Sequence, residues 1–232
     1  KSLYIMNDQS QARNKKLFNH TLVDFQEMET ETIGGKRHYV TPEGDRLKSV
    51  TSILSEALDN SALLRWKARV GEEEASKVST QAARRGTAVH NIAERYVLNQ
   101  NDIYKGEMPF NVGSFQPIKK ILDEHVNNVL GVEIPLYDTT LGCAGRTDLV
   151  AEYNGVASII DYKTSKKIKP EAWIESYFLQ STIYSMMFQK TFGIEIPQIA
   201  IIITVDHEPD AQIFVRNRSQ YVKKCLDILI KK

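Results

Sequence analysis

Alternating apolar positions lie on both sides of a tight-turn signal near the middle of the chain. Apolar-rich runs flank Asn154-Gly155, the strongest short-range pattern for a two-residue β-hairpin loop. If these two residues form the loop, Tyr153 faces Val156 and the numbers of paired residues sum to 309. This register predicts that Asp148 lies opposite Asp161. Because side chains alternate along a strand, Lys163 shares their face.

The predicted register brings two like charges together. Their β-carbons would be about 4.5–5.5 Å apart, where carboxylates repel each other. A divalent cation with oxygen ligands, such as Mg2+, removes that repulsion, and Lys163 can neutralise charge that develops on phosphorus. The alternative is a solvated surface hairpin, but Val150 and Ile159 on the same face favour the metal site.

The first part of the chain predicts an arm and a ribbon. Residues 1–20 are polar without clear periodicity, which indicates a poorly ordered arm or a helix packed from outside. Apolar-containing runs at 23–33 and 36–41 flank Gly34-Gly35, and Pro42-Glu43-Gly44 turns the chain again. We expect an accessory antiparallel ribbon with a structural role.

Helical patterns dominate the next part. One helix follows residues 49–54, a second begins at 61–66, and 72–98 is helix-forming with an interruption expected at Gly86. An apolar stripe over 114–130 predicts another helix, which Gly131 ends.

The last part alternates strands and helices. We predict a strand at 132–137 paired with 146–153, a helix over 171–192 and a strand at 198–205 buried on both faces. A short strand at 212–216 and a helix at 219–229 close the chain.

This order of elements predicts an α/β fold with a mixed central sheet and helices on both sides. We expect a single domain over 1–232. Its parts are the arm and ribbon (1–48), a helical region carrying His90 (49–130), and a core of sheet and helices (131–232).

Three local patterns add candidate residues. His90 and Glu94 share a helical face; a lone histidine is usually a core or surface residue, but the preceding Arg-Arg-Gly-Thr favours a site. Glu133 is an edge carboxylate or a site acid. The basic run Lys166-Lys167 is a solvated turn or a contact with a nucleic-acid backbone.

Composition limits the classes of partner and cofactor that we expect this chain to bind. The net charge is +1, so nucleic-acid binding must depend on local clusters. The two cysteines, Cys143 and Cys225, cannot build a four-cysteine iron–sulfur cluster. No apolar run approaches the roughly 20 residues that span a bilayer, so we expect no membrane association.

The motifs together resemble the PD-(D/E)XK nuclease superfamily. Asp148, Asp161-Tyr162-Lys163 and Gln180-x-x-x-Tyr184 are similar to its RecB-type branch, and within it to the mitochondrial genome maintenance exonucleases and phage-type exonucleases. The matching segments are SVTSIL, LLRWKARVG, RGTAVH, VEIPL, GRTDLVAEYNG, IIDYKTS and LQSTIY. They cover residues 49–184 and imply a restriction-endonuclease-like core.

The resemblance also implies roles for the matched residues. Asp148 and Asp161 would bind metal with His90, Glu133 and the Tyr162 carbonyl, while Lys163 would be the catalytic lysine. Gln180 and Tyr184 would orient Lys163 or the scissile strand. The expected cofactor is one or two Mg2+ or Mn2+ ions, with no iron–sulfur cluster.

The implied activity is metal-dependent hydrolysis of DNA, from a free end of a single strand, in replication, recombination or repair. The residues expected to contact DNA are Arg65, Lys67, Arg69, Arg84, Arg85, Arg146, Thr164, Ser165, Lys166 and Lys167. Trp66 and Tyr96 are candidates for base stacking, although core packing is favoured for both, as it is for Trp173, Tyr177, Met187 and Phe188.

Two other functions stay open. One is a structure- or sequence-specific endonuclease of the same fold, and the other is a non-catalytic DNA-binding recombination factor. We expect a monomer that works with replication or recombination proteins. The absence of a transit peptide favours the cytoplasm of a bacterial or phage-infected cell over the mitochondrial matrix.

Overall fold

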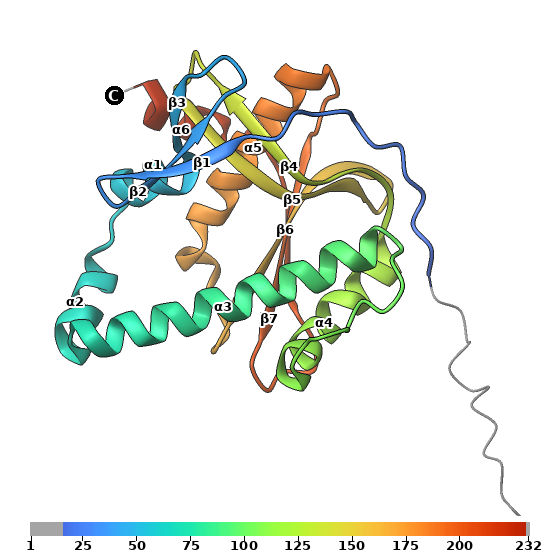
Figure 1. The fold of residues 1–232 in the computed structure, drawn as a ribbon, viewed down its shortest axis with the longest axis horizontal. Helices are drawn as coiled ribbons and strands as arrows, with labels where there is room; N and C mark the ends of the chain where they lie inside the picture. The colour runs from blue at the N-terminus through green and yellow to red at the C-terminus, as the bar shows by residue number, and fades with distance from the viewer. Residues whose placement is uncertain (1–15, 231–232) are drawn as a thin grey trace, which may run out of the picture.

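An eight-stranded mixed sheet organises residues 16–230, the part of the chain described in this computed structural model (Figure 1). Most of the predicted N-terminal arm, residues 1–15, lies outside the described residues. The strands are β1 (Glu29–Ile33), β2 (Lys36–Val40), β3 (Arg46–Ser49), β4 (Val126–Asp138), β5 (Cys143–Tyr153), β6 (Val156–Ser165), β7 (Gln198–Val205) and β8 (Gln212–Asn217). The helices are α1 (Val50–Ala57), α2 (Ser61–Val70), α3 (Glu72–Val97), α4 (Pro109–His125), α5 (Glu175–Phe192), α6 (Ser219–Ile230) and the short 3-10 helix η1 (Glu171–Trp173).

The central hairpin has the predicted register. β5 and β6 pair antiparallel from Tyr153–Val156 to Leu149–Ile160, so Asp148 and Asp161 are one step beyond the last pair. Both loop residues have positive φ, 50° at Asn154 and 78° at Gly155, as a type I′ turn requires.

Helices cover both faces of the sheet, which confirms the mixed α/β architecture. α1, α5 and α6 pack on one face and α3 and α4 on the other (Figure 1). Alternate residues of β7 enter the two hydrophobic clusters, Ile201 one and Ile202 the other. β7 lies between β6 and β8, so the isoleucine-rich run forms an interior strand as predicted.

The sheet opens in the middle of β5. One edge of β5 pairs with β4 along its length, and the other pairs with β3 at Cys143–Ala144 and with β6 only from Leu149 onward. Residues 145–148 therefore have no strand partner on that edge. The Asp148 carboxylate fills part of this gap by accepting a hydrogen bond from the Tyr162 N–H at 2.9 Å.

Three helix predictions differ from the structure. The helix predicted over 171–192 begins at Glu175, after η1, and the helix predicted from 114 begins at Pro109. α3 runs through Gly86 without a break, because one glycine costs about 1 kcal/mol in a helix and the helix buries Val89 and Ile92 just beyond it. α4 ends at His125, not at Leu130, and the chain continues directly into β4. Lys16 helps to end this helix, because its Nζ donates to the carbonyls of Leu122 and Asp123 at 2.9 and 2.7 Å.

The ribbon is part of the main sheet. β1 and β2 form the predicted hairpin around Gly34-Gly35, but β3 also pairs in parallel with β5. The ribbon therefore extends the sheet beside the opening in β5.

Candidate metal and nuclease site

Three side chains of metal-ligand type converge at the opening in the sheet. His90 comes from α3, Glu133 from β4 and Asp148 from β5, and one ligand atom of each lies within 4.8 Å of the others. Nitrogen and carboxylate oxygen atoms in this arrangement are suited to Mn2+ or Mg2+. All three were candidate ligands from the sequence.

Strand register places Glu133 across from Asp148. The neighbouring pairs are Val132–Leu149 and Ile134–Thr147, so the two acids share the step between them. Glu133 has a φ of 51°, a left-handed conformation that is costly for a residue with a side chain and persists where surrounding contacts hold it. Arg146 provides such a contact, because its Nη1 donates to the Glu133 carbonyl and its guanidinium pairs with Glu27.

His90 links the helix to both central strands. Its Nε2 lies 2.8 Å from the Tyr162 carbonyl and its Nδ1 lies 3.3 Å from the Asp148 carboxylate. Burial lowers the pKa of His90, but the Asp148 carboxylate outweighs burial and the result is a pKa of about 9. In the metal-free protein the imidazolium therefore supplies positive charge between the acids.

The acids respond to the same crowding in opposite directions. Burial, with a further contribution from Asp148, raises the pKa of Glu133 to about 7. Burial also acts to raise the pKa of Asp148, but the charge and hydrogen bond of His90 lower it overall. Glu133 therefore releases its proton less readily than an exposed glutamate, and a bound cation would favour its charged form.

Asp161 lies beside this group rather than within it. Its Oδ2 is 2.5 Å from Lys163 Nζ. Burial raises the pKa of Asp161 to about 6, with Lys163 opposing the rise and Asp148 adding to it. Lys163 Nζ also lies 5.1 Å from the centre of the Tyr177 ring, a cation–π distance.

Two residues of α5 that were predicted for the site, Gln180 and Tyr184, support strand β5. Gln180 Nε2 donates to the Tyr184 hydroxyl at 3.0 Å. The Tyr184 ring packs on Gly145, where an added β-carbon would be 2.5 Å from the ring carbon Cε1. Tyr184 therefore touches the backbone three residues before Asp148.

The basic residues among the predicted DNA contacts fall into two groups, while of the other two Ser165 is buried and Thr164 half-buried. Arg85 pairs with Asp206 at 2.6 Å and donates to the Ser165 carbonyl, and Arg146 is engaged with Glu27 and Glu133, so these arginines serve internal contacts. The other basic side chains of the set are exposed and form no ion pair among residues 16–230. They are Arg65, Lys67, Arg69, Arg84, Lys166 and Lys167.

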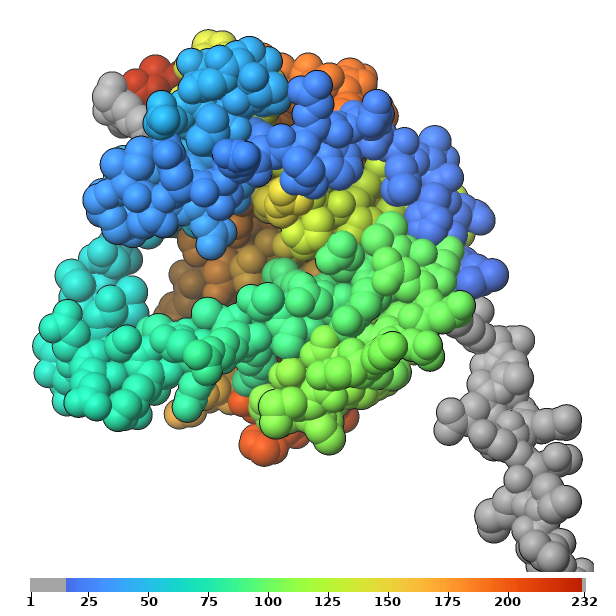
Figure 2. All heavy atoms as spheres, viewed as in Figure 1, coloured from blue at the N-terminus to red at the C-terminus, as the bar shows by residue number. Residues whose placement is uncertain are grey.

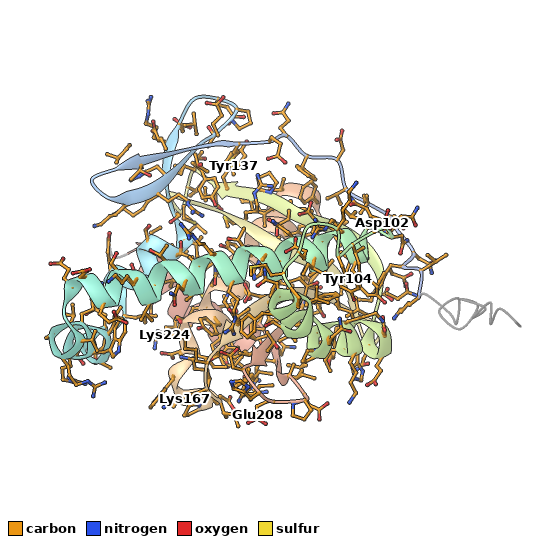
Figure 3. The ribbon with its side chains drawn as sticks, turned by 60° about the horizontal axis from the view of Figure 1, so that its bottom comes forward. Asp102, Tyr104, Tyr137, Lys167, Glu208 and Lys224 are labelled. Atoms are coloured by element: carbon orange, nitrogen blue, oxygen red, sulfur yellow. The ribbon has the colours of Figure 1, made fainter. Side chains whose placement is uncertain are left out.

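The exposed cations of α2 and α3 lie before Val89, where α3 begins to pack on the sheet. α2 buries none of its residues, and Figure 2 shows a deep hollow bounded by α2, α3 and the β1–β2 hairpin. The back of this hollow has the colour of β6 and α5 in Figure 2. Thr164 of β6 faces α3 at Gly86, 4.0 Å from an added β-carbon. In Figure 3, Lys167 is labelled at the lower edge of the view, close to Glu208, and it belongs to the loop after β6.

One of the side chains expected in the core is exposed. Tyr96, Met187 and Phe188 are buried as expected, but Trp173 is 73% exposed and that prediction is wrong. Tyr177 is partly buried and packs against the core as expected, and its ring also faces Lys163. The contact of Tyr177 with Lys163 and that of Tyr184 with Gly145 were not predicted from the sequence. A tyrosine one helical turn before Gln180 and a glycine inside strand β5 are the sequence features that could have indicated them.

Among the described helices, none is long and apolar enough to cross a membrane.

Comparison with known proteins associates part of the chain with named exonucleases. No family model matches. Mitochondrial genome maintenance exonuclease 1 of Mus musculus is 31% identical over 131 residues, which is 53% of this chain and 38% of the mouse protein. The Homo sapiens protein of the same name is 29% identical over 144 residues, 59% of this chain and 40% of its own length. The chain spans about two fifths of the length of these relatives.

The solved structure of the protein SSO0001 is 15% identical and covers 79% of this chain and 75% of its own, with a TM-score of 0.37. A score this low does not define a shared fold. Part of this chain is therefore similar to two proteins that are named as exonucleases.

Proposed function

We propose that this protein is a metal-dependent deoxyribonuclease that hydrolyses single-stranded DNA from a free end. The observation that carries the proposal is the convergence of His90, Glu133 and Asp148 within 4.8 Å, beside the Lys163–Asp161 pair. The exonuclease names of the partial relatives agree with it. A restriction-endonuclease-like core of the RecB type belongs to the same proposal.

The donor set fits a divalent cation. Two carboxylates and an imidazole crowd together, and one of the acids has a pKa near 7 because burial disfavours its charge. His90, Glu133, Asp148, Asp161 and the Tyr162 carbonyl would hold one or two Mg2+ or Mn2+ ions. A bound ion supplies positive charge and lowers the pKa of water.

The chain's own residues do the rest of the work. Lys163 places an ammonium group where negative charge develops on the phosphorus during attack. Asp161 and the Tyr177 ring hold that ammonium in position. Tyr184, held by Gln180, fixes the part of β5 that presents Asp148.

Cleavage assays with end-labelled single-stranded DNA test the site. We expect Asp148→Asn and Lys163→Ala to lower the rate by at least about 100-fold, the scale of losing one charge-stabilising group. Asp210→Ala is the control, because Asp210 is an exposed acid paired with Lys120 away from the site. Near-normal rates in both site variants would refute the proposal.

The choice of metal is a separate test. A histidine ligand favours Mn2+ over Mg2+, so we expect activity with Mn2+ at least equal to that with Mg2+. Isothermal titration should also show Mn2+ binding that Asp148→Asn abolishes, without reference to cleavage.

A comparison of linear and circular single-stranded DNA tests the requirement for a free end. A linear single strand should be degraded and the same strand as a closed circle should persist, because exposed cations bound a hollow that a strand end can enter. Equal loss of both would indicate an endonuclease. Affinity that survives EDTA, with no product at any metal concentration, would indicate a binding factor.

We propose a monomer that acts in DNA replication, recombination or repair. We propose the cytoplasm of a bacterial or phage-infected cell as its location, with the mitochondrial matrix as the alternative. The names of the relatives agree with the alternative.

A further inference from the structure

Trp173 is the feature that the proposed site leaves unexplained. Its side chain is 73% exposed, and it belongs to η1, between β6 and α5. Single exposed apolar residues are common, but an indole is the largest apolar side chain and is normally packed at least on one face. Its exposure therefore needs a second observation before it indicates a ligand.

The first such observation is that the loop carrying Trp173 is held firmly. Gln212 of β8 brackets Lys169 by accepting from its N–H at 2.8 Å and donating to its carbonyl at 3.0 Å. Glu171 pairs with Arg216 of β8 at 2.6 Å. The Trp173 N–H donates to the Pro170 carbonyl. The indole is thus presented to solvent by an anchored backbone, so its exposure is not a consequence of a loose loop.

The second observation is the charge around it. Lys166 and Lys167 are exposed in the same loop and form no ion pair within the described part of the chain. Figure 3 shows Lys167 at the margin of the molecule, near Glu208 of the neighbouring loop, with which it forms no ion pair. Ile168, directly after these two lysines, is 60% exposed. Cations interleaved with apolar and aromatic surface are the composition of single-strand binding surfaces, where phosphates meet the cations and bases stack on the ring.

The third observation is proximity to Lys163. The loop begins at the end of β6, two residues after Lys163, and it leads into α5, whose Tyr177 lies under the same ammonium group. A strand with one phosphate at Lys163 therefore passes next to this loop.

We propose that Trp173 is a base-stacking residue for single-stranded DNA, with Lys166 and Lys167 holding the adjoining phosphates. This inference rests on the proposed function and adds a named contact to it. The indole stacks on an unpaired base next to the nucleotide whose phosphate lies at Lys163. Because every base has an aromatic face, the contact tolerates any sequence.

Fluorine NMR tests the contact directly. The chain contains two tryptophans, Trp66 and Trp173, so 5-fluorotryptophan labelling gives two resonances and Trp173→Phe identifies one of them. An Asp148→Asn background slows cleavage during the titration and keeps Lys163, whose phosphate contact places the strand beside this loop. We expect the Trp173 resonance to shift with a short single-stranded oligonucleotide and to stay in place with an abasic strand of the same length.

Affinity gives the matched measurement. In the same background, Trp173→Ala should raise the dissociation constant for the oligonucleotide about 10-fold, and Trp173→Phe should raise it less, because base stacking contributes about 1–3 kcal/mol per base. Ile230→Ala is the control, since Ile230 is 69% exposed at the end of α6. It should leave the constant unchanged.

The outcomes separate the two proposals. If the wild type degrades the strand but Trp173→Ala binds as tightly as its parent, or if the base-containing and abasic strands shift the resonance equally, the stacking role is wrong and the nuclease proposal stands. If no protein binds the oligonucleotide and the wild type does not cleave it, both proposals fall together.

Discussion

Gly145 and Tyr184 form the tightest contact beneath the candidate site. An alanine at Gly145 would place its β-carbon 2.5 Å from the Tyr184 ring, closer than real β-carbons approach other atoms. Either the ring or β5 must move, and Asp148 is only three residues away. We expect Gly145→Ala to destabilise the fold by about 1–3 kcal/mol, as overpacking does, and to lower cleavage more than stability alone explains.

Thermal unfolding and initial cleavage rates measure both effects. Gly113→Ala is the control, because Gly113 is inside α4 and nothing lies within 4 Å of an added β-carbon. That substitution should leave the melting temperature unchanged or raise it. A Gly145→Ala variant that melts and cleaves like the wild type would mean that Tyr184 does not fix β5.

Tyr177 acts on Lys163 through its ring, not its hydroxyl. The ring centre is 5.1 Å from the ammonium nitrogen, so an aromatic side chain is the property that matters. We expect Tyr177→Phe to keep most of the activity and Tyr177→Leu to lower kcat several-fold with little change in KM. The same loss in both variants would instead assign the role to the hydroxyl.

Some contacts between individual residues could be predicted from the sequence and others could not. The two-residue turn at Asn154-Gly155 determines which residues of the two strands face each other. The proximity of Asp148 and Asp161 could therefore be predicted by counting from the turn. The ion pair between Asp161 and Lys163 could not be predicted in this way, because strand register does not determine side-chain rotamers. Nor does any local pattern predict that Glu133 has a left-handed backbone.

Among the elements, α3 carries two adjacent arginines with different environments. Arg85 is nearly buried, with 11% of its side chain exposed, and it joins α3 to the ends of β6 and β7 through Ser165 and Asp206. Arg84 is exposed and lines a surface pocket of about 470 Å3 that residues of α3 form together with Glu107. From the sequence, both arginines were expected to contact DNA.

Substituting each arginine separates structure from binding. We expect Arg85→Gln to lower the free energy of unfolding by about 3 kcal/mol, since it leaves Asp206 without its partner. Arg84→Gln should leave stability unchanged and weaken binding to single-stranded DNA, with a smaller dependence of affinity on salt. Urea unfolding and binding at several salt concentrations measure this, and the opposite assignment would contradict it.

The junction of α4 and β4 shows why element boundaries were harder to predict than elements. Val126, Val129 and Leu130 continue the apolar stripe of the helix, and they fit a strand equally well. What decides between them is non-local: the chain at residues 19–23 pairs alongside β4, and Lys16 takes the last carbonyls of the helix. These partners are about a hundred residues away in sequence.

For the whole molecule, the same reasoning explains the ribbon. A hairpin at Gly34-Gly35 is a local event and was predictable. The parallel pairing of β3 with β5 joins residues almost a hundred positions apart, and it depends on the packing of α1 and α5 beneath them. That pairing creates the opening in β5, so the sequence predicted the ligands of the candidate site but not the gap that brings them together.

The charge balance of this opening predicts how the metal-free protein responds to pH. Burial raises the pKa of Glu133 to about 7 and that of Asp161 to about 6. Burial opposes the rise at His90, but Asp148 carries its pKa to about 9. A group whose folded pKa is raised contributes stability below its unfolded pKa, and that contribution is lost as pH rises through the folded pKa. All three groups therefore favour the folded state in acid.

In EDTA we expect the melting temperature to fall as pH rises from about 5 to about 9, because protons and a dication neutralise the same cluster. Mn2+ should restore stability most at the upper end of that range, where it competes with the fewest protons. Glu133→Gln should flatten the lower part of the EDTA profile, between about pH 5 and 7, since it removes the acid that titrates there. A melting temperature in EDTA that rises across the range, or that Mn2+ leaves unchanged at every pH, would mean that the cluster is not the site of a dication.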